Sequence, residues 1–218
     1  MKKNGFPTFF PVLINLKKFP CLVIGGGEAA RRKVISLKEF NADITVLSPR
    51  ICRQLKELAG KNEIKIIKKS YSREYIKNFK FVFCTTDNKE TNKIIYKDCT
   101  EESILINVAD DPSLCDFILP ANIKRGDLTI SVSSQGQAPF YTKEMKKKLN
   151  SFIPPVYTDI IELAGIFRKE LLSGKKAKSA KEKSKMFKKF TSTDWEKILS
   201  ENGVKNPRYY VKKILREN

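Results

Sequence analysis

The sequence predicts an α/β fold with a doubly wound parallel sheet, and three features of the chain support this prediction. Over roughly the first 110 residues, short apolar runs alternate with segments of helical spacing. The run Cys21–Ile24 leads into Gly25–Gly27 and then into a helical segment, which is a strand–turn–helix pattern. Phe81–Cys84 is almost wholly apolar, as expected of a strand that is covered on both faces.

The elements predicted for this first part follow the alternation in order. Strands are indicated at Pro11–Leu16, Cys21–Ile24, Asp43–Leu47, Ile64–Lys68, Phe81–Cys84 and Ser103–Val108. Helical segments are indicated between them at Glu28–Phe40, Arg50–Ala59, Arg73–Asn78 and Thr91–Cys99. After a short opening strand, five parallel strands with crossover helices are typical of a Rossmann-type nucleotide-binding unit.

The pattern changes after Val108. Phe117–Ala121 and Leu128–Ser133 alternate in the manner of β-strands, and a turn at Lys124–Asp127 joins them. A strongly basic helix is predicted at Phe140–Leu149, and an amphipathic helix at Tyr157–Leu172.

The remaining apolar residues are enough for a small helical module; they are Trp195, Ile198, Leu199, Tyr210, Val211 and Ile214. We therefore divide the chain into a Rossmann domain at 1–114, a small α/β segment at 115–152, and a helical domain with a basic C-terminal extension at 153–218.

The glycine turn has the spacing of a dinucleotide-binding site. Gly25 permits a tight turn, Gly27 lets a pyrophosphate approach the backbone, and Ala30 lets the helix pack close to the strand. This predicts that the chain binds NAD or a related nucleotide. No acidic residue ends the second strand, where the sequence is Leu47–Arg50; Ser48 is a candidate for the ribose, and Arg50 leaves NADP open.

Polar residues also follow the fourth and fifth strands, at the edge of the sheet where ligands bind. Thr85 and Thr86 are expected to face the cleft, while Asp87 or Asn88 alternatively caps the next helix. In the segment Asn107–Pro112, the two carboxylates of Asp110 and Asp111 could accept protons or hold a divalent cation. The alternative is an Asp-Asp-Pro turn with a capping side chain.

The composition of the chain limits which side chains can transfer protons and which ligands the chain can bind. The 218 residues contain no histidine, so proton chemistry falls to carboxylates, tyrosines, lysines or thiols. The formal charge of +19 suits a polyanionic ligand. The N-terminal residues lack a signal-peptide pattern and no apolar run is long enough to span a bilayer, so a cytoplasmic protein is expected. Five scattered cysteines fit reduced, mostly buried thiols.

A polar loop and a basic helix form a candidate site for an anion. The loop Ser133–Pro139 offers hydroxyls and backbone N–H groups, and Lys143, Lys146, Lys147 and Lys148 follow it. The alternative is a solvated basic face, and this alternative weighs more for the lysines of the C-terminal extension, where aromatic residues do not interleave with the charges.

Several of these motifs resemble one family when they are taken in order. The segments FFPVLINL, GGGEAARRK, FCTTDNKETN, NVADDPSLCDFILPA and LTISVSSQGQAP resemble the precorrin-2 dehydrogenase / sirohydrochlorin ferrochelatase family, which forms the N-terminal module of siroheme synthases. The resemblance covers about residues 6–170. It implies NAD-dependent oxidation of precorrin-2 to sirohydrochlorin and, in many members, insertion of ferrous iron in the same cleft.

The resemblance also implies roles for particular residues. The catalytic aspartate is Asp110, which would also contact the metal transiently if the chain is a chelatase. The cofactor-binding residues are Gly25, Gly27, Glu28, Ala29, Ser48, Pro49, Arg50, Thr85, Thr86, Asn107 and Val108. For the carboxylate-rich macrocycle, the predicted contacts are Ser133, Ser134, Gln135, Gly136 and Lys143. A homodimer is implied, with the segment 115–152 at its interface.

Two alternatives remain open from the sequence. One is a dehydrogenase without chelatase activity, since no carboxylate spacing decides this point. The other is a nucleotide-sensing or nucleic-acid-binding protein that uses the glycine turn for regulation and the basic tail for the polyanion. The tail contains no known recognition pattern, so neither a nucleic-acid partner nor a membrane is expected.

Overall fold

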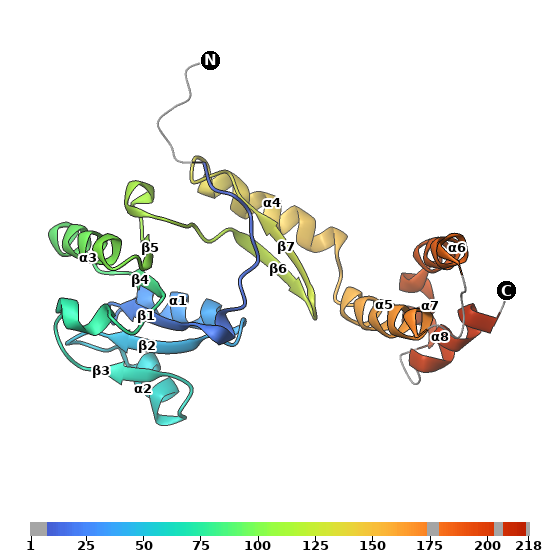
Figure 1. The fold of residues 1–218 in the computed structure, drawn as a ribbon, viewed down its shortest axis with the longest axis horizontal. Helices are drawn as coiled ribbons and strands as arrows, with labels where there is room; N and C mark the ends of the chain where they lie inside the picture. The colour runs from blue at the N-terminus through green and yellow to red at the C-terminus, as the bar shows by residue number, and fades with distance from the viewer. Residues whose placement is uncertain (1–7, 174–178, 203–206, 217–218) are drawn as a thin grey trace, which may run out of the picture. The chain divides into compact units, whose positions relative to one another are not determined.

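The computed structural model describes residues 8–173, 179–202 and 207–216. Its residues form two compact units (Figure 1). The first consists of Met1–Leu119 with Gln135–Gln137, and the second of Pro120–Ser134 with Ala138–Asn218. The three-part division at residues 114 and 152 stays a prediction beside these two units.

The first unit contains a five-stranded parallel sheet (Figure 1). Its strands are β1 (Pro20–Ile24), β2 (Asp43–Leu47), β3 (Lys65–Ile67), β4 (Phe81–Cys84) and β5 (Leu105–Val108). They lie in the order β3-β2-β1-β4-β5, which confirms the predicted doubly wound topology.

The register of this sheet aligns the last residues of four strands. Ile24 lies opposite Leu47 on one side and Cys84 on the other, and Cys84 lies opposite Val108. The segments that follow β1, β2, β4 and β5 therefore meet at one edge of the sheet. This edge is where the sequence predicts the nucleotide site.

Helices cover both faces of the sheet because alternate strand residues point to opposite sides. The helices α1 (Glu28–Lys38) and α2 (Arg53–Gly60) pack on the face that carries Val23, Val46 and Phe83. The helix α3 (Lys89–Glu101) packs on the other face. Short 3₁₀ turns are η1 (Leu16–Lys18), η2 (Arg73–Ile76) and η3 (Pro112–Leu114).

The predicted opening strand at Pro11–Leu16 is wrong. Residues 8–15 have no regular structure, and Leu16 begins η1 instead. Neither sheet among the described residues includes this stretch, so its backbone lacks the ladder that defines a strand. Its apolar side chains are consequently left in solvent, with Leu13 86% exposed.

The first strand of the predicted hairpin lies four residues further along than expected. Phe117 packs edge-on against Phe81 and Phe83 in the first unit, with ring centroids 5.6 and 5.4 Å apart. The antiparallel pair is β6 (Ala121–Arg125) and β7 (Leu128–Val132). The alternation at Phe117 reflects packing on the parallel sheet rather than pairing in the hairpin.

The second unit continues with helices α4 (Pro139–Phe152), α5 (Tyr157–Leu172), α6 (Ala180–Thr191), α7 (Trp195–Asn202) and α8 (Pro207–Arg216). The bounds of α5 agree with the prediction. Helices α5 to α8 share a core that includes Leu163, Phe167 and Trp195, which confirms the helical module. Residues 174–178 of the basic extension lie outside the described residues.

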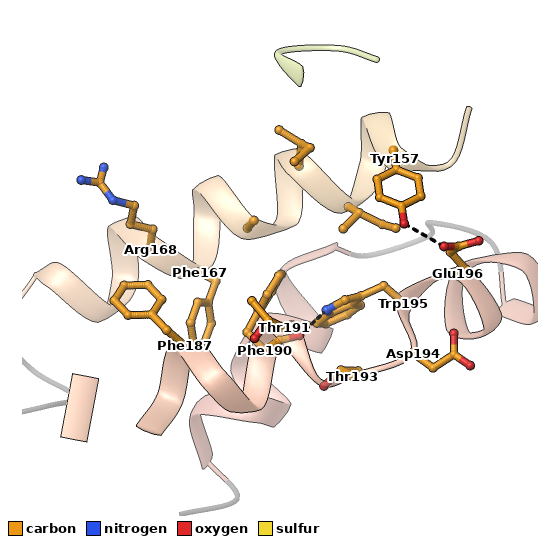
Figure 2. Close-up of a pocket in the computed structure, with 13 residues that line it drawn as sticks. Tyr157, Phe167, Arg168, Phe187, Phe190, Thr191, Thr193, Asp194, Trp195 and Glu196 are labelled. Carbon is orange, nitrogen blue, oxygen red and sulfur yellow. Dashed lines mark hydrogen bonds between the residues drawn. The ribbon is translucent and has the colours of Figure 1, made fainter. Parts of the chain in front are cut away.

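The helical module also contains a cavity of about 440 Å³ (Figure 2). Aromatic side chains form much of its wall, namely Phe167, Phe187, Phe190 and Trp195. The indole Nε1 of Trp195 donates to the carbonyl of Phe190 at 2.8 Å, and the Tyr157 hydroxyl donates to Glu196 at 2.9 Å. None of the predicted catalytic or cofactor-binding residues lines this cavity.

Candidate functional site

The glycine turn after β1 contains three glycines with different surroundings. Gly25 has φ +124°, and a Cβ there would lie 2.5 Å from the Thr85 Oγ1. A Cβ on Gly26 would lie only 1.9 Å from the carbonyl oxygen of Arg50. At Gly27 no protein atom lies within 4 Å of the equivalent position. Packing thus requires the first two glycines and leaves open space at the third.

The open space at Gly27 lies at the start of α1. Gly27 is the N-cap residue and has no side chain to satisfy the first N–H groups of the helix. An anion at this position would receive those N–H groups and the positive end of the helix dipole. The turn therefore fits the pyrophosphate of a dinucleotide. Glu28 is exposed and pairs with Arg31 at 2.6 Å, and this hydrogen bond lowers the pKa of the Glu28 carboxyl.

The loop after β2 is bonded to the glycine turn. The Cys52 N–H donates to the carbonyl of Gly26 at 2.8 Å, and the Ser48 hydroxyl donates to the carbonyl of Arg50 at 2.8 Å. Pro49 and Arg50 are exposed. The role of Gly26 was not predicted from the sequence, although a third consecutive glycine, beyond the two that the motif needs, was a usable signal.

The contrast between Gly26 and Gly27 predicts unequal effects of one substitution. Gly26→Ala should lower the free energy of unfolding by about 2 kcal/mol or more, because the methyl group would overlap the Arg50 carbonyl. Gly27→Ala should cost less, about 1 kcal/mol at most, because the methyl group enters open space and only the poorer N-cap preference of alanine opposes it. Urea unfolding of the two variants measures this difference, and equal midpoints would contradict it.

The segment after β4 is held by its own hydrogen bonds. The Thr85 hydroxyl donates to the carbonyl of Ile24 at 2.9 Å, and the Thr86 hydroxyl donates to the side chain of Asn92. Asn92 is buried and donates in return to the carbonyl of Thr86 at 3.1 Å. Between the two capping candidates, Asn88 caps α3 by accepting from the Thr91 N–H at 2.9 Å. The role of Asn92, a polar residue on the buried face of α3, was not predicted from the sequence.

The segment after β5 separates the two adjacent carboxylates. Asp111 caps η3, accepting hydrogen bonds from the Ser113 N–H at 3.1 Å and the Ser113 hydroxyl at 2.5 Å. Asp110 is exposed and has φ +63°, a left-handed conformation that Asp tolerates better than most residues. Capping therefore occupies Asp111, and Asp110 presents its carboxylate to solvent.

Asn107 and Val108 are the last two residues of β5, and both are buried. The Asn107 amide donates to the carbonyl of Phe117 at 3.0 Å and accepts from the ammonium group of Lys33 at 3.2 Å. Protein groups thus bind both ends of this amide. A cofactor contact of Asn107 or Val108 stays a prediction.

The predicted substrate-binding residues divide between the two units. Gln135 and Gly136 belong to the unit that carries Asp110, and a Cβ on Gly136 would lie 3.7 Å from the Pro112 ring. The Gln135 side chain accepts from the Phe9 N–H at 2.8 Å. The other three residues, Ser133, Ser134 and Lys143, belong to the second unit, where Lys143 is exposed and Ser134 accepts from the Ala138 N–H at 2.9 Å.

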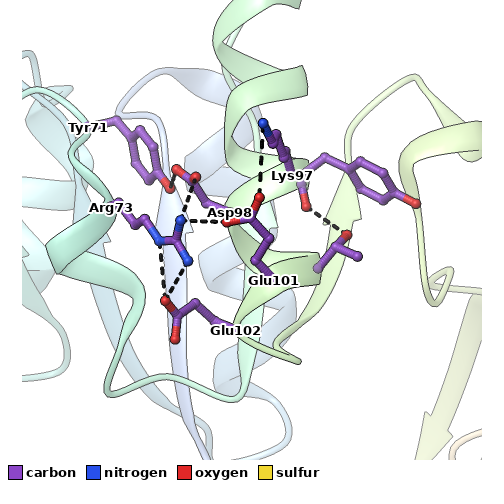
Figure 3. Close-up of polar contacts among 8 residues, drawn as sticks. Tyr71, Arg73, Lys97, Asp98, Glu101 and Glu102 are labelled. Atoms are coloured by element: carbon purple, nitrogen blue, oxygen red, sulfur yellow. Dashed lines mark hydrogen bonds and ion pairs between the residues drawn. The ribbon is translucent and has the colours of Figure 1, made fainter.

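A second group of charged side chains lies at the other end of α3 (Figure 3). Arg73 pairs with Glu101 at 2.5 Å and Glu102 at 2.8 Å, and the Tyr71 hydroxyl donates to Asp98 at 2.8 Å. Burial and the Asp98 carboxylate raise the pKa of Tyr71. Because α3 runs back from the end of β4 to the start of β5, this group lies away from the glycine turn and ties η2 to α3.

The described ranges contain neither a cluster of metal ligands nor a helix suited to cross a membrane. Across residues 8–173, 179–202 and 207–216, no three His, Cys, Asp or Glu side chains form a group that could hold a metal ion. Among the helices in these same ranges, none has both the length and the apolar character needed to cross a bilayer. All five cysteines are free thiols, and burial raises the pKa of Cys84 to about 11.

Comparison with known proteins agrees with the geometry of this edge. A family model described as "Putative NAD(P)-binding" matches residues 12–121. Siroheme synthase of Pseudoalteromonas translucida (strain TAC 125) is 34% identical over 163 residues, which cover 75% of this chain and 34% of that protein. Siroheme synthase of Nitrosococcus oceani is 33% identical over 194 residues, covering 88% of this chain and 39% of that protein. The chain therefore spans about a third of the length of these relatives.

A solved structure shares the fold. The structure of "SirC, precorrin-2 dehydrogenase" superposes with a TM-score of 0.74 over 94% of this chain and 98% of that chain. The sequence identity is 24%, so this similarity supports the fold.

Proposed function

Because this chain belongs to the family of NAD(P)-binding modules found in siroheme synthases, we propose that it oxidises precorrin-2 to sirohydrochlorin with NAD as the hydride acceptor. One structural observation carries the proposal. The open helix start at Gly27 follows β1 and the exposed residue Asp110 follows β5, at one edge of the sheet where only β4 separates these two strands, so a dinucleotide and a proton acceptor would fit the same site.

The chain would bind the dinucleotide through its backbone more than through charged side chains. The pyrophosphate would lie on Gly27 and the first N–H groups of α1, between Glu28 and Ala29 on the helix and the loop Ser48–Arg50. Thr85, Thr86 and the end of β5 would line the nicotinamide side. The bonds from Thr85 to Ile24 and from Thr86 to Asn92 support this arrangement, because they hold the lining in one conformation.

Asp110 would act as the base. NAD would supply the hydride acceptor and the Asp110 carboxylate would accept the proton, so that the substrate would lose two hydrogen atoms in total. Asp110 is suited to this role because capping does not occupy it and because it lies at the surface of the unit. A carboxylate base would also suit a chain without histidine.

The proposal also includes the contacts to the macrocyclic substrate and the pairing of two copies of the chain. Substrate carboxylates would bind Ser133, Ser134, Gln135, Gly136 and Lys143. The net charge of +19 supports this assignment, because it attracts a polyanion.

A homodimer is supported by the exposed aromatic side chains of α4, with Phe140 78% and Phe152 77% exposed. The two-stranded sheet β6–β7 also supports it, since a lone hairpin is marginally stable in water. Light scattering of the purified protein would measure the dimer.

Incubation of the purified chain with precorrin-2 and NAD tests the function. We expect NADH and the sirohydrochlorin chromophore to appear in equal amounts, with NADP supporting slower turnover. Turnover with neither nucleotide would reject the proposal.

A separate reaction tests whether the same cleft inserts metal. Ferrous or cobaltous ions are added to purified sirohydrochlorin in the presence of the chain, and Asp110 would accept the pyrrole protons. If metal insertion is no faster than without protein, the chain is a dehydrogenase without chelatase activity.

A further inference from the structure

Lys33 is a partly buried lysine that none of the proposed steps uses. It lies on α1 on the side that faces the sheet, between the buried residues Ala30, Val34 and Leu37 of that helix. Its ammonium nitrogen lies 5.5 Å from the centroid of the Phe83 ring and 3.2 Å from the Asn107 Oδ1. The lysine therefore links α1 to the ends of β4 and β5.

The surroundings make this a costly position for a charge. Burial lowers the pKa of the Lys33 ammonium group, whereas the nearby Cys115 and Asp110 act to raise it. An apolar side chain of similar length would fill the same space without that desolvation cost. The interactions that offset the cost are the Phe83 ring, the Asn107 amide and the negative charge of Asp110.

Asn107 connects Lys33 to the turn that carries Asp110. Its amide group bonds to Lys33 at one end and to the carbonyl of Phe117 at the other, so the segments on both sides of the turn are joined. The thiol of Cys115 closes the same turn, accepting from the Val108 N–H at 3.2 Å and lying 3.2 Å from the Asp111 carbonyl. Within the turn, Asp110 keeps its left-handed conformation.

We propose that Lys33 is a positioning residue for the dehydrogenation: through Asn107 it holds the turn after β5, and so holds the Asp110 carboxylate where it accepts the proton. This inference rests on the proposed function, in which Asp110 is the base. A displacement of the carboxylate by about 1 Å is enough to lower a rate about 100-fold.

Substitution of Lys33 tests the inference through a separation of kcat from KM. In Lys33→Met, which keeps the side-chain length, we expect kcat for precorrin-2 oxidation to fall about 10- to 100-fold while KM for NAD stays within about two-fold. Lys33→Arg keeps the charge and a donor for Asn107, so it should restore most of kcat. Lys97→Met is the matched control, since Lys97 is an exposed lysine of α3 whose removal should leave both constants unchanged.

Nuclear magnetic resonance tests the same inference without turnover. The amide resonances of Ala109, Asp110 and Asp111 should shift in Lys33→Met and stay near their wild-type positions in Lys33→Arg. Unchanged resonances in Lys33→Met, or equal losses of kcat in the methionine and arginine variants, would overturn the inference. If the wild-type chain does not oxidise precorrin-2, the proposed function fails, and the resonances still decide whether Lys33 holds the turn.

Discussion

Asp110→Asn is expected to lower kcat for precorrin-2 oxidation by about 10²- to 10⁴-fold, which is the range for loss of a general base. The amide cannot accept the proton that the carboxylate is proposed to accept. Asparagine is a better test than alanine, because it tolerates the left-handed conformation at φ +63°. NAD affinity, measured by calorimetry, should change by less than about two-fold, because the proposed pyrophosphate site is at the start of α1.

The adjacent carboxylate offers a matched control. Asp111→Asn removes one negative charge at the neighbouring position, and asparagine caps a helix about as well as aspartate. Its bond to the Ser113 N–H should therefore persist, and kcat should stay close to the wild-type value. Near-normal sirohydrochlorin formation by Asp110→Asn would remove Asp110 from its proposed role.

Gly27→Asp is expected to raise the Kd for NAD by about 100-fold or more. The structure leaves open space where the new side chain would enter, so the fold should tolerate the change. That space is where the pyrophosphate would lie, and the aspartate would bring a like charge and a steric conflict to it. Isothermal titration with NAD measures the loss of affinity.

A second glycine separates this local effect from the added charge. Gly60, at the end of α2, likewise has nothing within 4 Å of a would-be Cβ apart from its chain neighbours and the backbone of its own helix. Gly60→Asp therefore adds the same carboxylate elsewhere on the first unit and should leave NAD affinity unchanged. Unchanged affinity in Gly27→Asp would count against the whole placement of the dinucleotide.

The strands of the parallel sheet could be predicted because burial on both faces leaves a clear pattern in the sequence. Asp43–Leu47 and Phe81–Cys84 have the predicted bounds, since runs of apolar residues with polar neighbours admit few other structures. Pro11–Leu16 and Phe117–Ala121 have similar apolar content, yet the first contains no strand and the second enters one only at Ala121. A strand also needs a partner for its backbone, and the sequence pattern does not say whether one is present.

At the site, too, the roles that depend on adjacent residues could be predicted, and those that depend on distant partners could not. The spacing of Gly25 and Gly27 was sufficient to predict a nucleotide turn, because that chemistry depends on residues that are adjacent in sequence. The choice between Asp110 and Asp111 was open from the residues alone, because it depends on which carboxylate caps η3. Gly26 packs against Arg50, Asn92 bonds Thr86, and Lys33 bonds Asn107, so their roles involve partners from 6 to 74 residues away.

The order of apolar and polar residues along the chain determined which segments form the buried parallel strands, the glycine turn and the helical module, because each of these leaves a pattern within a few residues. The tertiary structure decided which carboxylate is exposed, which glycine leaves room for a ligand, and which lysine reaches the end of β5. Those outcomes depend on distances between segments that only the packing of strands and helices brings together. Register between strands, rather than any local propensity, therefore determines which groups can act on one ligand.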